Sequence, residues 1–296
     1  MLRTNKDRLV MISIQGRVSY PVSRGPYRIT YDGKPVTLPG VGGITYNIKV
    51  GDFAFGWEAD HVEPGVSTVV NEEKRDEGPN CAYNILACMG NQARVVSGEA
   101  KGALGVVTGH HGGIEHVLID FDQETLEKLC VGDKILIKAY GQGLKLLDYP
   151  EIKIFNLDPS LLEKLNIKEV GNGNIDVPVT CEIPAKLMGS GLGSASVASG
   201  DYDITTADKK MVEKYKLDQI RFGDIVVIKD ADNSFGRSYR EGAVSVGIVV
   251  HSDCVIAGHG PGVATLLTSS TSKKIKFHID TNANIANYLS IGTKRE

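Results

Sequence analysis

VGDKILIKAY (131–140) and FGDIVVIKDA (222–231) share one pattern, in which an apolar residue and Gly-Asp precede an apolar run that ends in Ile-Lys. VGDFAFGW (50–57) is a weaker third copy. Glycine supplies the left-handed conformation that ends a turn, and aspartate accepts hydrogen bonds from its own local backbone before a strand begins. The repeat therefore predicts turns that lead into strands, as in small β-barrels.

Further strand patterns recur along the chain as alternating or β-branched runs, in VMISIQGRV (10–18), GALGVVTG (102–109), HVLIDF (116–121), AVSVGIVVH (243–251) and KIKFHI (274–279). Helical periodicity is confined to short stretches, namely 80–91, 122–130 with Asp122 as its cap, and 205–215 with a Thr205 capping box. The expected fold is mainly β, with small barrel-like or sandwich units, a few short helices and an irregular N-terminal portion. The expected ranges are 1–75, 76–168 and 169–296; one continuous β domain is the alternative.

Composition excludes several classes of protein. The 296 residues are 42% hydrophobic, which is enough to bury a substantial core. The net charge of -3 is spread along the chain, so no basic stripe predicts a nucleic-acid partner. No apolar run approaches the roughly 18 residues of a membrane helix, so no membrane partner is expected. The five cysteines form no Cys-x-x-Cys pair, and the cytoplasm is the expected location.

Four long stretches carry a resemblance to a known family: VTGHHGGIEHVLIDF (107–121), AYGQGLKL (139–146), VPVTCEIPAKLMGSGLGS (177–194) and DADNSFGRSYREGAVSVGIVVHSDCVIAGHGPGV (230–263). They resemble the bacterial "domain of unknown function 4438". That resemblance implies a β-rich chain divided into small domains and no assigned activity. The chemistry must therefore be argued from the polar residues themselves.

Two bends repeat one device. DHVEPGVSTVV (60–70) and GHGPGVATLL (258–267) each place a histidine two or three residues before Pro-Gly-Val. If the bends converge, His61 and His259 meet. The alternative is that Pro-Gly-Val forms a type II turn and each histidine caps it. A third copy, Pro39–Val41, has no neighbouring histidine and favours the alternative.

Strand geometry restricts which histidines can act together. A hairpin pairing 243–251 with 254–262 would place His251 at its solvated tip. At about 3.3 Å per residue, His259 would then lie roughly 15 Å from His251, too far to share an ion. This reasoning keeps His259 and removes His251 from the predicted site.

Imidazole and carboxylate groups are the ligands that suit borderline divalent metals. The seven histidines offer several admissible sets, namely His61 with Asp60 or Glu63, and His110 or His111 with Glu115. The predicted metal ligands are His61, His111 and His259. Glu63 is the predicted general base for a metal-bound water. Gly260 and Gly262 are predicted ligand-binding positions because they lack a β-carbon.

A polar loop, DADNSFGRSYRE (230–241), offers a second group of candidates. Its oxygen-rich start resembles a calcium loop, but position six is Phe235 instead of glycine, and a strand precedes the loop. An Asp/Asn turn balanced by Arg237 and Arg240 is the simpler interpretation. Asp230, Asp232 and Arg237 are nevertheless candidate ligand-binding residues, since arginine can clamp a carboxylate substrate.

The Gly-Ser segment MGSGLGSASVASG (188–200) could form an anion-binding nest, but it lacks the Gly-Lys-Ser/Thr ending of a phosphate loop. A flexible loop or lid is the favoured interpretation, and no nucleotide or flavin cofactor is expected. Cys81 lies in the first turn of a predicted helix, where the helix dipole can activate a thiol.

Three functions follow from these candidates. The preferred hypothesis is a metal-assisted hydrolase or lyase that acts on a small molecule with a divalent ion as cofactor. The second is a non-catalytic protein that binds a small ligand or metal, as a homo-oligomer. The third is a thiol enzyme that uses Cys81.

Overall fold

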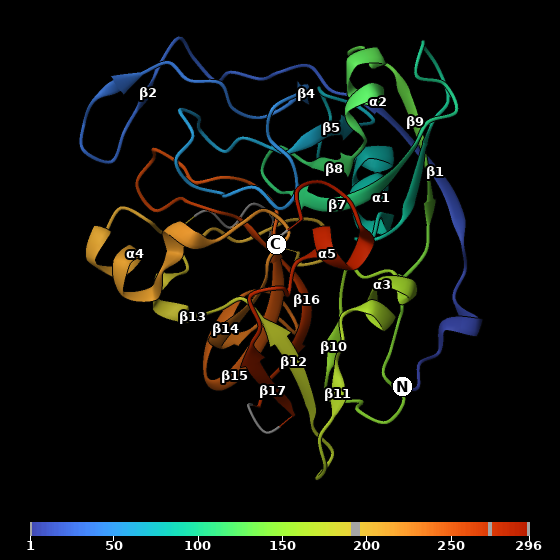
Figure 1. Ribbon diagram of the computed structural model, residues 1–296, viewed down its shortest axis with the longest axis vertical. Coiled ribbons are helices and arrows are strands. Elements are labelled where there is room, and N and C mark those ends of the chain that lie inside the picture. The colour runs from blue at the N-terminus through green and yellow to red at the C-terminus, as the bar shows by residue number, and fades with distance from the viewer. Residues whose placement is uncertain (1, 191–195, 272–273, 295–296) are drawn as a thin grey trace.

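A computed structural model describes residues 2–190, 196–271 and 274–294. Six strands form a closed barrel, seen at the upper right of Figure 1, because β1 pairs with both β9 and β5. Their order is β1 (Ile12–Val18), β9 (Lys134–Ala139), β6 (Gln92–Val95), β7 (Leu104–His111), β8 (His116–Asp120) and β5 (Gly65–Val69), with β4 (Ile44–Thr45) beside β5. Apolar side chains such as Val107 and Ile137 fill the core of this part.

The lower half of Figure 1 contains a second, five-stranded sheet. Its order is β10 (Lys153–Ile154), β16 (Val263–Ser269), β15 (Ser238–Val249), β14 (Ile225–Asp232) and β13 (Cys181–Pro184). Smaller sheets join β11 (Lys168–Glu169), β12 (Ile175–Val179) and β17 (Ile275–Ile279), and join β2 (Arg28–Ile29) to β3 (Pro35–Val36). The predicted mainly β fold is confirmed.

Short helices connect the strands: α1 (Gly78–Leu86), α2 (Gln123–Lys128), α3 (Pro159–Lys164), α4 (Lys209–Tyr215) and α5 (Ile285–Leu289). Asp122 caps α2 as predicted, accepting from the backbone N–H of Thr125. The predicted Thr205 capping box is wrong, because Thr205 donates its backbone N–H to Leu187 and Asp208 caps α4 instead. No helix in the described ranges is long and apolar enough to cross a membrane.

The three Gly-Asp turns share one local geometry. Gly132, Gly223 and Gly51 have φ of 89°, 81° and 95°. Each following aspartate accepts from the backbone N–H three residues earlier: Asp133 from Cys130 at 2.9 Å, Asp224 from Arg221 at 2.9 Å, and Asp52 from Lys49 at 2.8 Å. The first two turns lead directly into β9 and β14, whereas only an isolated bridge follows the third. The sequence repeat therefore predicted the turn correctly in all three copies and the strand in two.

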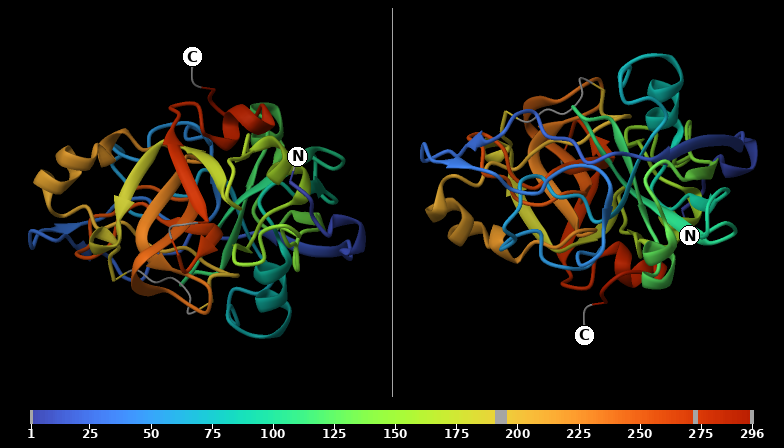
Figure 2. Two further views of the ribbon diagram at one scale, coloured as in Figure 1. Left: turned by 90° about the horizontal axis from the view of Figure 1, so that it is seen from below. Right: turned by 90° about the horizontal axis from the view of Figure 1, so that it is seen from above.

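Residues 19–64 connect β1 to β5 by a long excursion across the molecule, visible from above in Figure 2. The backbone N–H of Tyr31 donates to the Val255 carbonyl at 2.8 Å, and that of Gly51 donates to Phe222 at 2.9 Å. These contacts attach the excursion to the C-terminal half before it returns to the barrel. It thereby brings the first His-bearing bend to the second.

Candidate metal centre

The two His-bearing bends meet. Nε2 of His61 and Nδ1 of His259 are 3.2 Å apart. His61 adopts φ of 59°, a left-handed conformation that is uncommon for non-glycine residues. Of the two alternatives that the sequence left open, the structure shows that the bends converge.

The third Pro-Gly-Val copy joins the same assembly. The backbone N–H of Asp60 donates to the Pro39 carbonyl at 3.0 Å, and a β-carbon on Gly40 would lie 2.7 Å from the Asp60 carbonyl oxygen. Only Gly65 has the positive φ, 70°, that a type II turn needs, whereas Gly40 and Gly262 lie outside the left-handed region. A turn therefore accounts for the glycine in one of the three copies. Close packing of other atoms accounts for the glycine in the other two.

The prediction for His251 is wrong. β15 pairs with β16 in the register Val249↔Val263, so the partner strand begins at Val263 and not near residue 254. Residues 250–262 form a wide connection, and His251 at its start is fully buried. Its ring centroid lies 4.2 Å from that of His111 and 5.1 Å from that of His61.

Two carboxylates that sequence reasoning missed complete the cluster. Asp201 and Asp203 are 1% and 3% exposed. Oδ2 of Asp201 is 2.7 Å from Nε2 of His251, and Oδ2 of Asp203 is 2.8 Å from Nδ1 of His259. The Asp-x-Asp spacing was a usable signal, since alternate residues of an extended segment share a face.

The ligand atoms divide into two groups, named here by their position relative to the pocket. The outer group is His61, His259 and Asp203, all of which line the pocket. The inner group is His111, Asp201 and His251, whose ligand atoms lie within 4.8 Å of one another and are buried, and of which only His111 also lines the pocket. Asp203 also reaches the inner group, with Oδ1 3.4 Å from Nε2 of His251.

Three of the four imidazoles are held by Nδ1. His61 contacts Oδ1 of Asp60 at 3.1 Å, His111 contacts Oε1 of Glu63 at 2.6 Å, and His251 contacts the Ser252 carbonyl at 2.9 Å. Each partner is an acceptor, so each Nδ1 must carry the proton. In the neutral form of each ring, the lone pair of Nε2 is then available toward the cluster. Metal-binding histidines are typically held in this way by a carboxylate or carbonyl behind the ring.

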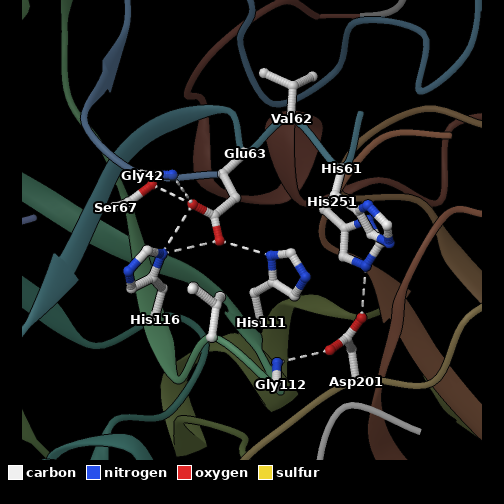
Figure 3. A network of polar contacts seen from close by, with 12 residues as sticks. Gly42, His61, Val62, Glu63, Ser67, His111, Gly112, His116, Asp201 and His251 are labelled. Carbon is white, nitrogen blue, oxygen red and sulfur yellow. Dashed lines mark hydrogen bonds and ion pairs between the residues drawn. The ribbon is translucent and has the colours of Figure 1, made fainter. Parts of the chain in front are cut away.

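Glu63 lies behind His111 and His116, as Figure 3 shows. Its oxygens also accept from Ser67 Oγ at 2.5 Å and from the Gly42 N–H at 2.8 Å. Burial alone would raise the pKa of Glu63, but His116 and His111 hold it well below its usual value. Glu63 is 1% exposed, and this position favours an orienting role over the predicted general-base role.

Cys254 lies beside the outer group, but its thiol is already used. Sγ donates to Oδ1 of Asp60 at 3.0 Å. Burial and then the charge of Asp60 raise the pKa of Cys254 far above its ordinary value, so the thiol stays protonated. Cys254 could join His61 and His259 as a metal ligand only by losing this proton and its hydrogen bond to Asp60, so the outer group is defined here by His61, His259 and Asp203.

A pocket of about 360 Å³ opens onto the outer group. Arg24 and Arg28 line it together with apolar side chains. Nε of Arg28 donates to Oδ2 of Asp60 at 3.0 Å, which links this arginine through Asp60 to His61. The positive charge beside the cluster thus comes from Arg24 and Arg28, neither of which the sequence had indicated.

The predicted glycines lie at the site. A β-carbon on Gly262 would be 1.9 Å from Oδ2 of Asp201 and 2.3 Å from Nε2 of His251. One on Gly260 would be 1.9 Å from the Ile204 carbonyl oxygen. Gly262 therefore borders the inner group, while Gly260 permits close backbone packing.

The polar loop at 230–241 makes mainly local contacts. Oδ1 of Asp230 accepts from the Gly242 N–H at 2.8 Å, and Asp232 pairs with Arg240 at 3.3 Å. This agrees with the Asp/Asn turn interpretation. Arg237 reaches toward the cluster, donating to the backbone carbonyl of Asp201, but it does not line the pocket.

The remaining candidates lie apart from the cluster. His110 is fully buried beside His111, and neighbouring residues of a strand point to opposite faces. Glu115 accepts from the Gly113 N–H at 3.0 Å. Cys81 has no contact with a histidine among the interactions of the described residues. Residues 191–195 of the predicted Gly-Ser lid lie outside the described ranges.

Comparison with known proteins supports the resemblance. The models described as domain of unknown function (DUF4438), N-terminal and C-terminal, match residues 27–163 and 164–289. The chain is also similar to the one in the crystal structure of TM1086, with 52% sequence identity and a TM-score of 0.91. The match covers 97% of this chain and 99% of the TM1086 chain. No curated protein matches the sequence. Since these matches span nearly its whole length, the chain belongs to the DUF4438 family.

Proposed function

We propose that the protein is a metal-dependent hydrolase or lyase that acts on a small anionic molecule. In this proposal the outer group, His61, His259 and Asp203, binds one divalent ion next to the pocket. The observation that carries it is the pair of imidazole nitrogens facing each other at 3.2 Å beside a buried carboxylate.

The spacing of the outer group suits an ion. Ligand atoms about 2.0–2.2 Å from a metal lie roughly 3–3.5 Å from one another. Of the three separations here, 3.2 Å lies within this range, and 2.8 and 3.7 Å lie just below and just above it. Oδ2 of Asp203 has no hydrogen-bond partner among the described residues although Nδ1 of His259 is so close, which a shared ion would explain.

Three protein ligands leave coordination positions open for water or substrate, as in catalytic metal sites. His259 is the most accessible of the three, with its side chain 31% exposed. A bound divalent ion would lower the pKa of a coordinated water and polarise a substrate oxygen. Glu63 is then a positioning residue that fixes His111, and Asp60 fixes His61.

The substrate class follows from the pocket. Nε of Arg28 donates to Asp60, and Arg24 donates one N–H to the Gly113 carbonyl at 3.0 Å. The terminal amino groups of Arg28 have no partner among the described residues. Guanidinium groups next to a metal suit a carboxylate or phosphate group. The polar loop residues Asp230, Asp232 and Arg237 are not needed for this recognition.

The test begins with elemental analysis of untagged protein and of the His259→Ala variant. We expect close to stoichiometric zinc, manganese, iron or cobalt in the wild type and less in the variant, with His278→Ala as a control for an exposed histidine. A screen of small carboxylate and phosphate esters, amides and lyase substrates should then reveal turnover that chelation abolishes and metal restores. Metal without any turnover would instead support the non-catalytic metal-binding alternative, and no metal uptake would refute both.

A further inference from the structure

The inner group has the features of a second metal site. Each ligand has one polar atom fixed from outside. Glu63 holds His111, and the Gly112 N–H donates to Oδ1 of Asp201 at 2.8 Å (Figure 3). The Ser252 carbonyl holds His251. The other polar atom of each side chain faces the common space. Such outward hydrogen bonds are the usual means of orienting metal ligands.

The inward atoms are buried and lack hydrogen-bond partners. Nε2 of His251 and Oδ2 of Asp201 are 2.7 Å apart, which is an ion-pair distance, but the contact does not have the direction of an N–H···O bond. Buried polar atoms without partners are rare, and an ion between them would account for both.

Gly262 leaves room for two of the ligand atoms. A β-carbon at this position would fall 1.9 Å from Oδ2 of Asp201 and 2.3 Å from Nε2 of His251. The backbone at Gly262 does not have a positive φ, so its conformation does not require glycine. The reason for glycine here is the close approach of neighbouring atoms. The glycine thus borders the space between the ligand atoms.

We propose that the inner group, His111, Asp201 and His251, binds a second divalent ion and that Asp203 bridges it to the ion of the outer group. Oδ2 of Asp203 faces His259, while Oδ1 is 3.4 Å from Nε2 of His251. One carboxylate oxygen is therefore available to each ion, as in two-metal hydrolases with ions about 3.5–4 Å apart. The mixed imidazole and carboxylate ligands select zinc, manganese, iron or cobalt over calcium. The bridging part of this inference rests on the proposed outer site.

An ion pair between protonated His251 and Asp201 is the alternative. Two buried carboxylates, Asp201 and Asp203, need compensating positive charge in either case. In the ion pair, the proton on His251 provides this positive charge. In the metal site, the ion provides it and replaces that proton. The two cases differ in the number of ions bound.

The deciding experiment is titration of chelator-treated protein with Mn²⁺ and Zn²⁺, followed by calorimetry and elemental analysis. We expect two equivalents per chain in the wild type and one in Asp201→Asn, whose amide oxygen can still accept from Gly112. Gly262→Ala should also bind one, and the exposed variant His278→Ala should bind two. Thermal melting would establish that each variant is folded.

Electron paramagnetic resonance of bound Mn²⁺ tests separately whether Asp203 bridges the two ions. We expect the second equivalent to convert the mononuclear signal into a spin-coupled one in the wild type, and Asp203→Asn to abolish that coupling. One equivalent in the wild type, lost in His259→Ala and kept in Asp201→Asn, would refute the second site and leave the proposed function intact. Two uncoupled ions would refute the bridge, and no uptake would refute the proposed function as well.

Discussion

His61 and His259 are separated by 198 positions in the sequence, yet their ring nitrogens Nε2 and Nδ1 face each other at 3.2 Å. The chain brings them together by carrying residues 19–64 away from the barrel and back, so that one bend rests on the other. Both histidines lie in connections and not in strands. The site is therefore held by the packing of connections against two rigid sheets, and its parts respond to substitution in distinguishable ways.

Glu63 should control metal affinity without touching the metal. Glu63→Gln keeps the shape of the side chain, but its single oxygen cannot accept both from the two histidines on one side and from Ser67 and Gly42 on the other. We expect the affinity for metal to fall by about 10–100-fold, as for other groups behind a ligand. Competition with a chromogenic chelator measures this, and the exposed Glu182→Gln serves as control. An unchanged affinity in a folded Glu63→Gln protein would show that His111 is oriented by other contacts.

Arg28 should determine binding of anions in the pocket. Arg28→Gln removes the charge next to His61, and a charge-assisted hydrogen bond contributes about 1.5–3 kcal/mol. We expect metal-loaded protein to bind inorganic phosphate or acetate at least about tenfold more weakly after this change. Isothermal titration with each anion separates a preference for phosphate from one for carboxylate. Arg240→Gln, far from the pocket lining, should bind both as the wild type does.

The free energy of unfolding should depend on pH through Asp120, at the end of β8. Burial raises the pKa of this carboxyl to about 7, opposed by the charge of Lys49. Between about pH 4 and pH 7 the folded protein keeps a proton that the unfolded chain has lost, so stability falls as pH rises through this window.

Replacing Asp120 by Asn removes that titration. We expect Asp120→Asn to have little effect near pH 4 and to stabilise the protein by roughly 2–4 kcal/mol above pH 7. Urea unfolding at pH 4.5 and pH 8 measures the difference. Equal effects at both pH values would mean that the carboxyl does not titrate in this window.

Two of the three Gly-Asp turns form a matched pair that can measure how much a close backbone contact adds to the cost of replacing glycine by alanine. Gly132 and Gly51 both have positive φ, but a β-carbon on Gly132 meets nothing within 4 Å, whereas one on Gly51 lies 1.8 Å from the Thr293 carbonyl oxygen. Gly132→Ala should cost about 1–2 kcal/mol from backbone conformation alone. Gly51→Ala should cost clearly more, because the C-terminal segment must shift. Similar costs in chemical denaturation would show that this segment moves freely.

The sequence by itself determined the strands and turns, because their conformation depends mainly on residues that are close together in the chain. Alternating or β-branched apolar runs predicted β1, β7, β8, β9, β14, β15 and β17. Burial alternates along β1 and β9, whereas β8 is buried on both faces. The Gly-Asp pattern predicted its turns, because a left-handed glycine and an aspartate bonded to the nearby backbone involve only a few neighbouring residues. The repeated bends also identified His61 and His259 as a pair, although the sequence left open whether they meet.

Tertiary structure alone decided the composition of the cluster. His251 was excluded by a hairpin register that the molecule does not use, and register depends on which distant segment supplies the partner strand. Asp201 and Asp203 become ligand candidates only because residues 250–262 pass over them. Glu63 was the predicted base, and the contacts of His111 and His116 with its carboxylate favour an orienting role instead. A few residues can specify a turn, but the burial and charge of a side chain depend on everything that packs around it.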